Sequence, residues 1–312
     1  MTVKDLVGGV TARAAAKVNV RLSVGAARDD GFHDLVNVFH AVSLFDDVTA
    51  RPADELRVTV DGRYADRVPT GPDNLAARAA RLLAGRTGMV PAVELRIRKT
   101  IPVAGGMAGG SADAAAALLA CDALWGTGLD RDALMALAGE LGSDVPFALL
   151  GGTAVGRGRG EILTQVPVSG RLHWVFAPAD GGLSTPAVYG EFDRLHAGTG
   201  LTPSAPSPDE KLMDALAAGD PYAVAARLAN DLQDAALSLR PGLATTLAAG
   251  TGAGGALGGL VSGSGPTCAF LAESAAHAER VEASLRSSGA SPGAVRADGP
   301  APGARLVGAD TP

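Results

Sequence analysis

Residues 101–120 read IPVAGGMAGGSADAAAALLA, a glycine-rich loop that runs directly into an alanine-rich segment. The loop contains four glycines, Gly105, Gly106, Gly109 and Gly110. Because glycine has no Cβ, such a backbone can turn sharply and approach a ligand closely. We expect a helix to begin at about Ser111, where unpaired amides and the positive end of the helix dipole favour phosphate oxygens. The stretch therefore predicts a phosphate-binding loop that leads from a strand into a helix.

The loop differs from the two most familiar nucleotide-binding loops. Gly110 is followed by Ser111 and Ala112 rather than by the Lys-Ser/Thr pair of a Walker A loop, and the spacing G-x-G-x-x-G does not occur here. A merely flexible connection between a strand and a helix could contain the same glycines. The assignment of the loop to phosphate binding therefore depends on other segments.

Length and composition limit what those segments can be. A chain of 312 residues is long for a single core and predicts two domains, and 47% apolar and 19% charged residues are typical of a globular protein. The net charge of −6 argues against a broad nucleic-acid-binding face. Such binding would rest only on Arg157 and Arg159, which we expect on a solvated turn.

The cysteine count and the lengths of the apolar runs argue against disulfide-rich, zinc-knuckle and membrane-spanning proteins. Only Cys121 and Cys268 occur, which indicates two small core residues rather than a disulfide framework or a metal knuckle. No apolar run reaches the roughly 20 residues of a membrane span, and the first residues lack a signal-peptide pattern. We therefore expect a cytoplasmic protein.

Periodicity predicts mixed α and β structure in both halves of the chain. Apolar and polar residues alternate from Lys17 to Val24, which predicts a strand with Lys17, Asn19, Arg21 and Ser23 on a polar face that lines a cleft. The other expected strands are 56–60, 92–99, a pair within 151–167, 172–179, and a strand, glycine turn and strand within 255–272. The expected helices are 72–88, 111–125, 130–141, 210–218 and 221–237. Residues 180–195 are expected to be rich in turns and 196–209 to form a surface loop.

Three features accompany the opening loop: the polar strand face, Asp144 just after a predicted helix, and a second glycine turn, SGSGPT, at 262–267. Together they resemble the three motifs of the GHMP kinase superfamily. The matching strings lie in family order between residues 16 and 267: AKVNVRLSV, GFHDL, DNL, IPVAGGMAGGSADAA, LGSDVPF, STPAVY, NDLQ and SGSGPT. One string could arise by chance, but eight in order are hard to obtain that way.

The resemblance implies a two-domain α+β fold. Its N-terminal, ATP-binding domain would span residues 1–168 and resemble domain 2 of ribosomal protein S5. The C-terminal, substrate-binding domain would span residues 169–312 and be ferredoxin-like.

Within the superfamily, these motifs resemble those of a branch that acts in the non-mevalonate pathway of isoprenoid precursor synthesis. That branch transfers phosphate from ATP to the 2-hydroxyl of a cytidine-diphosphate-linked methylerythritol. The resemblance therefore implies small-molecule substrates and neither nucleic acid nor membrane as a partner. Mg²⁺ is expected with the triphosphate. No dedicated carboxylate cage is visible in the sequence, so we assign no metal ligand and expect the ion to keep water and phosphate ligands.

The resemblance also implies roles for individual residues. Asp144 would accept the hydroxyl proton and Lys17 would be its partner, since a carboxylate is ionised near neutral pH and orients the hydroxyl. ATP would contact Asn74, Lys99, Pro102, Val103, Ala104, Gly105, Gly106, Met107, Ala108, Gly109, Gly110, Ser111 and Ala112. The acceptor would contact Asn19, Phe32, His33, Thr185 and Tyr189, with its cytosine between the rings of Phe32 and Tyr189 and its base edge on His33. The glycine turn would contribute Gly263, Ser264 and Gly265.

Taken singly, these residues also have simpler interpretations. Asp144 could be a helix cap and Asn74 could cap the helix that follows it. Phe32 and Tyr189 could be core residues, and His33 an ordinary surface histidine.

Three positions depart from the usual family pattern: Phe32 replaces Tyr, Ala108 replaces Gly, and Ala112 replaces Ser. These changes leave Ser111 as the remaining side-chain donor of the loop.

Two alternatives to the predicted reaction remain open. The chain could be another kinase of the superfamily, acting on mevalonate, homoserine or a sugar. It could also be a nucleotide-binding sensor without catalysis, although Lys17 and Asp144 argue against that. An aromatic cytidine pocket distinguishes the first alternative, because mevalonate has no base to stack.

Overall fold

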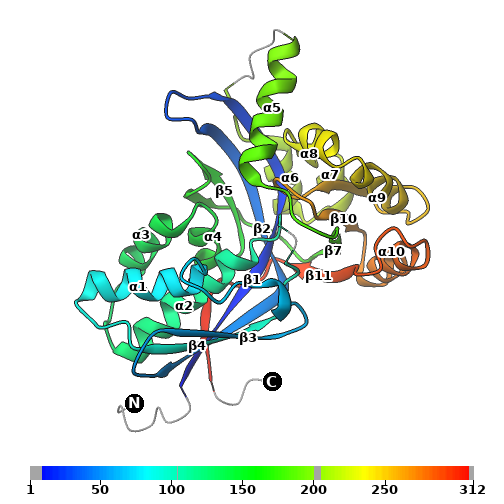
Figure 1. Ribbon diagram of the computed structural model, residues 1–312. Coiled ribbons are helices and arrows are strands. Elements are labelled where there is room, and N and C mark those ends of the chain that lie inside the picture. Colours follow the sequence, from blue (N-terminus) through cyan, green and yellow to red (C-terminus); the bar gives the residue numbers. More distant parts are fainter. Residues whose placement is uncertain (1–8, 104, 200–204, 309–312) are drawn as a thin grey trace.

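The computed structural model describes residues 9–103, 105–199 and 205–308, which are arranged around two β-sheets (Figure 1). The first sheet contains β1 (Val10–Ala27), β2 (His33–Pro52), β3 (Arg57–Gly62), β4 (Val93–Lys99), β5 (Thr153–Arg157), β6 (Ile162–Gln165), β8 (Ala229–Asn230) and β12 (Arg305–Val307). The second contains β7 (Leu172–Ala177), β9 (Gly258–Val261), β10 (Cys268–Ala272) and β11 (Val295–Gly299). The helices are η2 (Ala65–Arg67), α1 (Leu75–Thr87), α2 (Gly109–Trp125), α3 (Arg131–Leu141), α4 (Val145–Leu150), α5 (Thr185–Thr199), α6 (Glu210–Ala218), α7 (Pro221–Ala225), α8 (Gln233–Leu239), α9 (Gly242–Thr251) and α10 (Ala275–Ser287).

The long antiparallel pair of β1 and β2 forms the centre of the first sheet. Its order is β12-β1-β2-β4-β3, while β5 branches from β2 and leads to β6. The alternation predicted from Lys17 is present, and Val18, Val20 and Leu22 are buried. A register shift lies between Asn19 and Arg21, and such a bulge re-aims the side chains beyond it.

The alanine-rich helix α2 crosses the first sheet beneath a layer of helices. It contacts β1 and β2 on one side and α1, α3 and α4 on the other (Figure 1). Its alanines from Ala112 to Ala120 are fully buried. A helix buried all round needs no polar face, and small side chains let its neighbours approach closely. This explains a composition that has no amphipathic stripe.

The second sheet is antiparallel, in the order β11-β7-β10-β9. Helices α9 and α10 pack against it, and α5 packs against α8 (Figure 1). Its core includes Trp174, Phe176 and Phe270.

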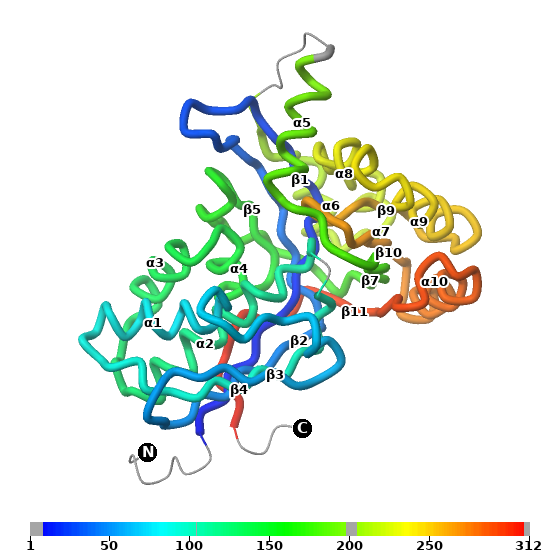
Figure 2. The backbone as a smooth tube through the Cα atoms, in the orientation of Figure 1, coloured from blue at the N-terminus to red at the C-terminus, as the bar shows by residue number. Residues whose placement is uncertain are grey.

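Segments from the C-terminal half complete the first sheet. β12 pairs with the beginning of β1, and β8 pairs in parallel with β1 at Arg21 and Leu22. Figure 2 accordingly shows the start of β1 (blue) and the segment of β12 (red) side by side at the foot of the first sheet. The boundary near residue 168 stays a prediction, and β8 and β12 show that residues on both sides of it share one sheet.

Several sequence predictions need correction. β2 was not expected, and α2 begins at Gly109, two residues before Ser111. The turn-rich stretch and the first part of the expected surface loop form α5, and the expected helix 221–237 is divided into α7, β8 and α8. The prediction also missed α4, α9, α10, β11 and β12.

Other predictions agree with the structure. Cys121 and Cys268 are buried and unpaired, as expected for core residues. Within the described ranges, no helix combines the length and apolar character that crossing a bilayer would require.

Candidate active site

A cleft of about 910 Å³ collects most of the predicted site residues. A volume of this size is typical of small-molecule sites. Its walls come from β1, the start of β2, the glycine loop, the residues before α4, the start of α5 and the second glycine turn. The site therefore draws on both halves of the chain.

Lys17 and Asp144, which are 127 positions apart in the sequence, meet in this cleft. Lys17 Nζ lies 3.7 Å from Asp144 Oδ2. Asp144 stands immediately before α4, but its side chain does not cap that short helix. The carboxylate is thus available to a ligand, which excludes the simple cap interpretation.

The ammonium of Lys17 is held in a buried polar network. It donates to Asn19 Oδ1 at 2.5 Å and to the carbonyl oxygen of Gly106 at 2.8 Å, and the residue is only 4% exposed. Burial lowers the pKa of Lys17, while the charge of Asp144 opposes that shift. Three fixed partners leave this side chain little freedom to turn away from the cleft.

Asn19 extends the network to the second half of the chain. Its Nδ2 donates to Asn37 Oδ1 at 2.9 Å, and Ser262 Oγ donates to Gly106 O at 2.8 Å and approaches Asn19 Oδ1 at 3.2 Å. Arg21, predicted on the same strand face, is not in the cleft. After the bulge it pairs with Asp209 at 3.3 Å, so the prediction for Arg21 was wrong.

The two glycine turns contact each other through their backbones. Gly105 and Gly106 have φ values of 87° and 84°, and a Cβ on either would clash with the backbone of Gly265 or Ser262. Thr267 Oγ1 also donates to Gly105 O at 2.8 Å. Glycine is therefore required here both by conformation and by space.

The N-terminus of α2 opens toward the cleft without a side-chain cap. Its N-cap residue is Ala108, in the left-handed region at φ 57°, ψ 33°, and no side chain accepts from the first amides. Gly109, Gly110 and Ser111 line the cleft beside it. Unpaired amides at a helix N-terminus favour anions, so the geometry suits the phosphate binding that the sequence predicts, and phosphate binding itself stays a prediction.

The remaining predicted loop residues divide into three groups. Pro102, Val103, Gly105 and Gly106 line the cleft. Met107 and Ala112 are fully buried in the core and do not line it. Ala104 lies outside the described residues.

Lys99 borders the cleft, but its ammonium is engaged by two carboxylates. Nζ donates to Asp46 Oδ2 at 2.7 Å and to Asp113 Oδ2 at 2.6 Å, and the side chain is 2% exposed. Burial opposes the charge on Lys99, but the two carboxylates outweigh it and raise its pKa. Burial also raises the pKa of Asp113, to about 8. This triad ties the end of β4 to β2 and α2.

Asn74 caps α1, as its simpler interpretation predicts. Its Oδ1 accepts from Ala76 N at 2.9 Å and Ala77 N at 3.3 Å, while Nδ2 donates to Pro69 O at 2.7 Å. The residue nevertheless borders the cleft, so a role beside ATP is compatible with the cap.

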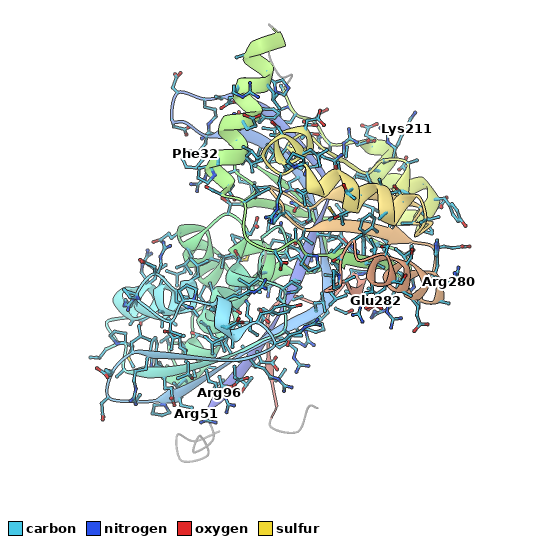
Figure 3. The ribbon with its side chains drawn as sticks, turned by 45° about the vertical axis from the view of Figure 1, so that its right-hand side comes forward. Phe32, Arg51, Arg96, Lys211, Arg280 and Glu282 are labelled. Atoms are coloured by element: carbon cyan, nitrogen blue, oxygen red, sulfur yellow. The ribbon has the colours of Figure 1, made fainter. Side chains whose placement is uncertain are left out.

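The predicted acceptor residues lie together at the other end of the cleft. The ring centroids of His33 and Tyr189 are 5.0 Å apart, and burial raises the pKa of the Tyr189 hydroxyl. Phe32 is 50% exposed beside α5 (Figure 3), which excludes a core role. Thr185 Oγ1 lies 3.0 Å from Ser264 Oγ in the glycine turn. All four line the cleft.

The structure adds residues that the sequence analysis did not assign. Asp193 Oδ1 lies 2.9 Å from Nε2 of His33 and so fixes its ring. Arg159 lies on a turn and its side chain is 40% exposed, as expected, but it also lines the cleft, with its Cζ 5.2 Å from the centroid of the Phe32 ring. Asp113 is a lone charge within an alanine run and Ser262 is the first residue of the SGSGPT turn, so the sequence marks both, whereas nothing in it marks Asp46.

Among the described residues, no group of three or more His, Cys, Asp or Glu side chains could hold a metal ion. Two of the carboxylates that line the cleft, Asp113 and Asp144, are paired with Lys99 and Lys17. These donors fit an ion that arrives with phosphate ligands better than a preformed protein site.

Comparisons with known proteins agree with this geometry. Residues 74–152 match the model of the GHMP kinases N terminal domain, and residues 212–291 match that of the GHMP kinases C terminal region. The 4-diphosphocytidyl-2-C-methyl-D-erythritol kinase of Streptomyces avermitilis is 60% identical over 96% of this chain and 99% of its own.

Solved structures are similar over nearly the whole chain. A crystal structure of 4-(cytidine 5'-diphospho)-2C-methyl-D-erythritol kinase has a TM-score of 0.75 at 34% identity and covers 96% of this chain and 99% of its own. Homoserine kinase from Cytophaga hutchinsonii has a TM-score of 0.70 at 19% identity and covers 96% of this chain and 97% of its own. The second similarity concerns the fold alone.

Proposed function

The chain belongs to the GHMP kinase family, and on this premise we propose that it phosphorylates 4-diphosphocytidyl-2-C-methyl-D-erythritol. It transfers the γ-phosphoryl group of ATP to the 2-hydroxyl of that acceptor, giving the 2-phosphate and ADP in the non-mevalonate pathway of isoprenoid precursor synthesis. The observation that carries this proposal is 60% identity to such a kinase over 96% of the chain. The two-domain α+β fold expected from the sequence is that of the family.

Asp144 and Lys17 supply the acid–base part of the reaction. The acceptor hydroxyl attacks the γ-phosphorus, the bond to the β–γ bridging oxygen breaks, and ADP leaves. Asp144 accepts the hydroxyl proton, and the ammonium of Lys17, 3.7 Å away, stabilises both the carboxylate and the charge on the phosphoryl oxygens. Because phosphoryl transfer depends mainly on position and charge, the rigid network around Lys17 is part of this role.

The amides at the start of α2 bind the phosphates of ATP. Gly109, Gly110 and Ser111 present the positive end of the helix, and Gly105 and Gly106 let the loop close against the second glycine turn. Asn74 and Lys99 border the nucleoside end. Mg²⁺ bound to the triphosphate would neutralise its charge, and the described carboxylates leave it to phosphate and water ligands.

The aromatic end of the cleft binds the cytidine of the acceptor. Phe32 and Tyr189 line this end, and His33, fixed by Asp193, lies beside Tyr189. Stacking between two rings and a polar contact to the base edge suit a pyrimidine. A cytoplasmic location remains a prediction from the sequence.

An assay of ADP release with four acceptors tests the function. We expect turnover with the cytidyl compound and none with mevalonate, homoserine or galactose. Turnover with mevalonate or homoserine alone would show that the cytidyl compound is not the acceptor. Nucleotide binding without turnover of any of the four would favour a non-catalytic sensor.

A further inference from the structure

The acceptor of the proposed reaction carries a diphosphate, and this doubly anionic group needs a cation at the aromatic end of the cleft. Among the described residues, the cations that line the cleft are Lys17, Arg67, Lys99 and Arg159. Lys17 and Lys99 are buried against carboxylates. Arg67 lies in η2, close in sequence to Asn74, which is expected beside ATP, and pairs with Asp180 at 3.6 Å. Arg159 is the remaining cation.

The turn that carries Arg159 is held rigidly against the acceptor site. It joins β5 to β6, and Gly158 O accepts from Leu35 N of β2 at 2.8 Å. A Cβ on Gly156 would clash with Gly160 O and the Phe39 ring, so the hairpin is closed tightly. The turn therefore sits at a fixed position beside the residues that begin β2.

Phe32, which contacts Arg159, is held in place by backbone hydrogen bonds of its own turn. Its carbonyl accepts from Arg28 N at 2.7 Å, and its amide donates to Asp30 Oδ1 at 3.0 Å. The guanidinium of Arg159 lies 5.2 Å from the ring centroid, within the range of a cation–π contact. The two side chains thus form one surface of the cleft, aromatic at one end and cationic at the other.

The guanidinium retains donors for a ligand. Glu161 Oε2 accepts from the Arg159 amide at 2.7 Å, and Glu161 Oε1 lies 3.5 Å from Nε. These contacts orient the arginine through its backbone and Nε. The side chain is 40% exposed, and its planar fork matches the paired oxygens of a phosphate.

We propose that Arg159, stacked on Phe32, binds the diphosphate of the acceptor and so determines specificity for a nucleoside diphosphate over a nucleoside. This inference rests on the proposed function, because it takes the acceptor's cytidine to lie against Phe32. A base on the aromatic surface brings the attached diphosphate, one ribose away, toward the cationic end of that surface.

Calorimetric titrations with cytidine and with cytidine 5'-diphosphate test the inference without requiring turnover. Arg159→Ala should weaken binding of the diphosphate by about tenfold or more, as expected for a lost charged hydrogen bond, and weaken binding of cytidine by less than about twofold. Arg157→Ala is the matched control: this arginine lies on the same hairpin but does not line the cleft, and both affinities should persist. In turnover, Arg159→Ala should raise the KM for the acceptor but not that for ATP.

The outcomes separate this inference from the proposed function. Equal losses for cytidine and its diphosphate would mean that Arg159 only supports the Phe32 ring, and no loss would remove it from the site; either result overturns the inference. Arg159→Lys keeps the charge but not the fork, and it should recover part of the lost affinity for the diphosphate. If the wild-type protein bound neither ligand and did not turn over the cytidyl acceptor, the proposed function itself would fail.

Discussion

Asp144 is the residue on which the proposed chemistry depends most directly. Its carboxylate faces Lys17 at 3.7 Å and has no capping role in α4. Asp144→Asn keeps the size and removes the proton acceptor, so we expect kcat to fall by about 10²-fold or more with little change in the thermal midpoint. Steady-state kinetics at saturating concentrations of both substrates measure this change.

A charge-matched variant controls for general effects on the fold. Asp130→Asn removes a carboxylate that caps α3, and asparagine caps equally well. We expect its kcat to stay at the wild-type level. A near-normal kcat for Asp144→Asn would remove Asp144 from the role of base.

Ala108 is the described non-glycine residue with positive φ, and it is the N-cap of α2, the helix that we propose to bind phosphate. An L-residue in this conformation costs roughly 1–2 kcal/mol. Ala108→Gly removes that strain but increases the freedom of the unfolded chain, so the free energy of unfolding should rise by at most about 1 kcal/mol. Ala108→Val should lower it by about 1–3 kcal/mol and raise the KM for ATP, because a β-branched residue fits this region poorly.

Urea unfolding and ATP titrations of turnover measure these two substitutions. Equal stability of the valine and glycine variants would show that the φ of residue 108 does not constrain the loop. The glycine usual in the family at this position fits the observed left-handed conformation.

At the scale of elements, the Lys99 triad attaches α2 to the sheet. Asp46 Oδ1 accepts from Thr100 N at 2.6 Å and from Ile101 N at 2.9 Å, while Asp113 binds Lys99 from α2. The loop and the helix are thus fixed at one buried point. Removing Lys99 would leave the buried carboxylate of Asp46 without its counter-ion, which typically costs 3–5 kcal/mol.

The raised pKa of Asp113 gives this attachment a pH dependence. Its pKa is about 8 in the folded protein and 3.8 ordinarily, so the folded state retains a proton that the unfolded chain loses. The associated stability is fully present below the unfolded pKa and declines as pH rises through about 8. Asp113→Asn resembles the protonated carboxyl and lacks this titration. The stability of the wild type relative to Asp113→Asn should therefore fall between about pH 5 and about pH 8.

Urea unfolding at several pH values measures this difference. The exposed Asp132, replaced by Asn, is the control, and its stability should follow the wild-type pH profile. Parallel profiles for the wild type and Asp113→Asn would contradict a shifted titration of Asp113.

Strands β3 and β4, in which burial alternates, were predictable, whereas β2, which is buried on both faces over much of its length, was not. The alternation in β3 and β4 and the capped helix α1 were read correctly from the sequence. β2 buries Val36, Val38 and Phe39 in turn, so its sequence lacks the period of two. α5 was misread as turns because Pro186 lies near its start, where a missing amide is tolerated.

At the scale of the whole molecule, the order of the motifs along the chain predicted which residues share the cleft. It did not predict the contacts that hold these residues in place. Lys17, Asp144, Phe32 and Tyr189 line it as expected. The contacts that connect the two halves, such as Ser262 with Gly106, depend on turn geometry between segments more than 150 positions apart. No local pattern encodes such a pairing, which is also why the position of Arg159 in the cleft was not predicted.

The contacts between the two halves make the second glycine turn part of the proposed catalytic geometry. Gly263 has φ 59°, and a Cβ there would lie 3.0 Å from Asn19 Oδ1 and 3.5 Å from Lys17 Nζ. Gly263→Ala should therefore displace the Lys17 network and lower kcat by roughly tenfold or more, because small misplacements of catalytic groups are costly. Gly255→Ala is the matched control: its φ is 69°, and its Cβ would meet nothing within 4 Å. Both variants should lose about 1 kcal/mol of stability from the positive φ, but only Gly263→Ala should lose activity. Similar kcat values for the two variants, measured alongside urea unfolding, would show that the turn from the second half does not position Lys17.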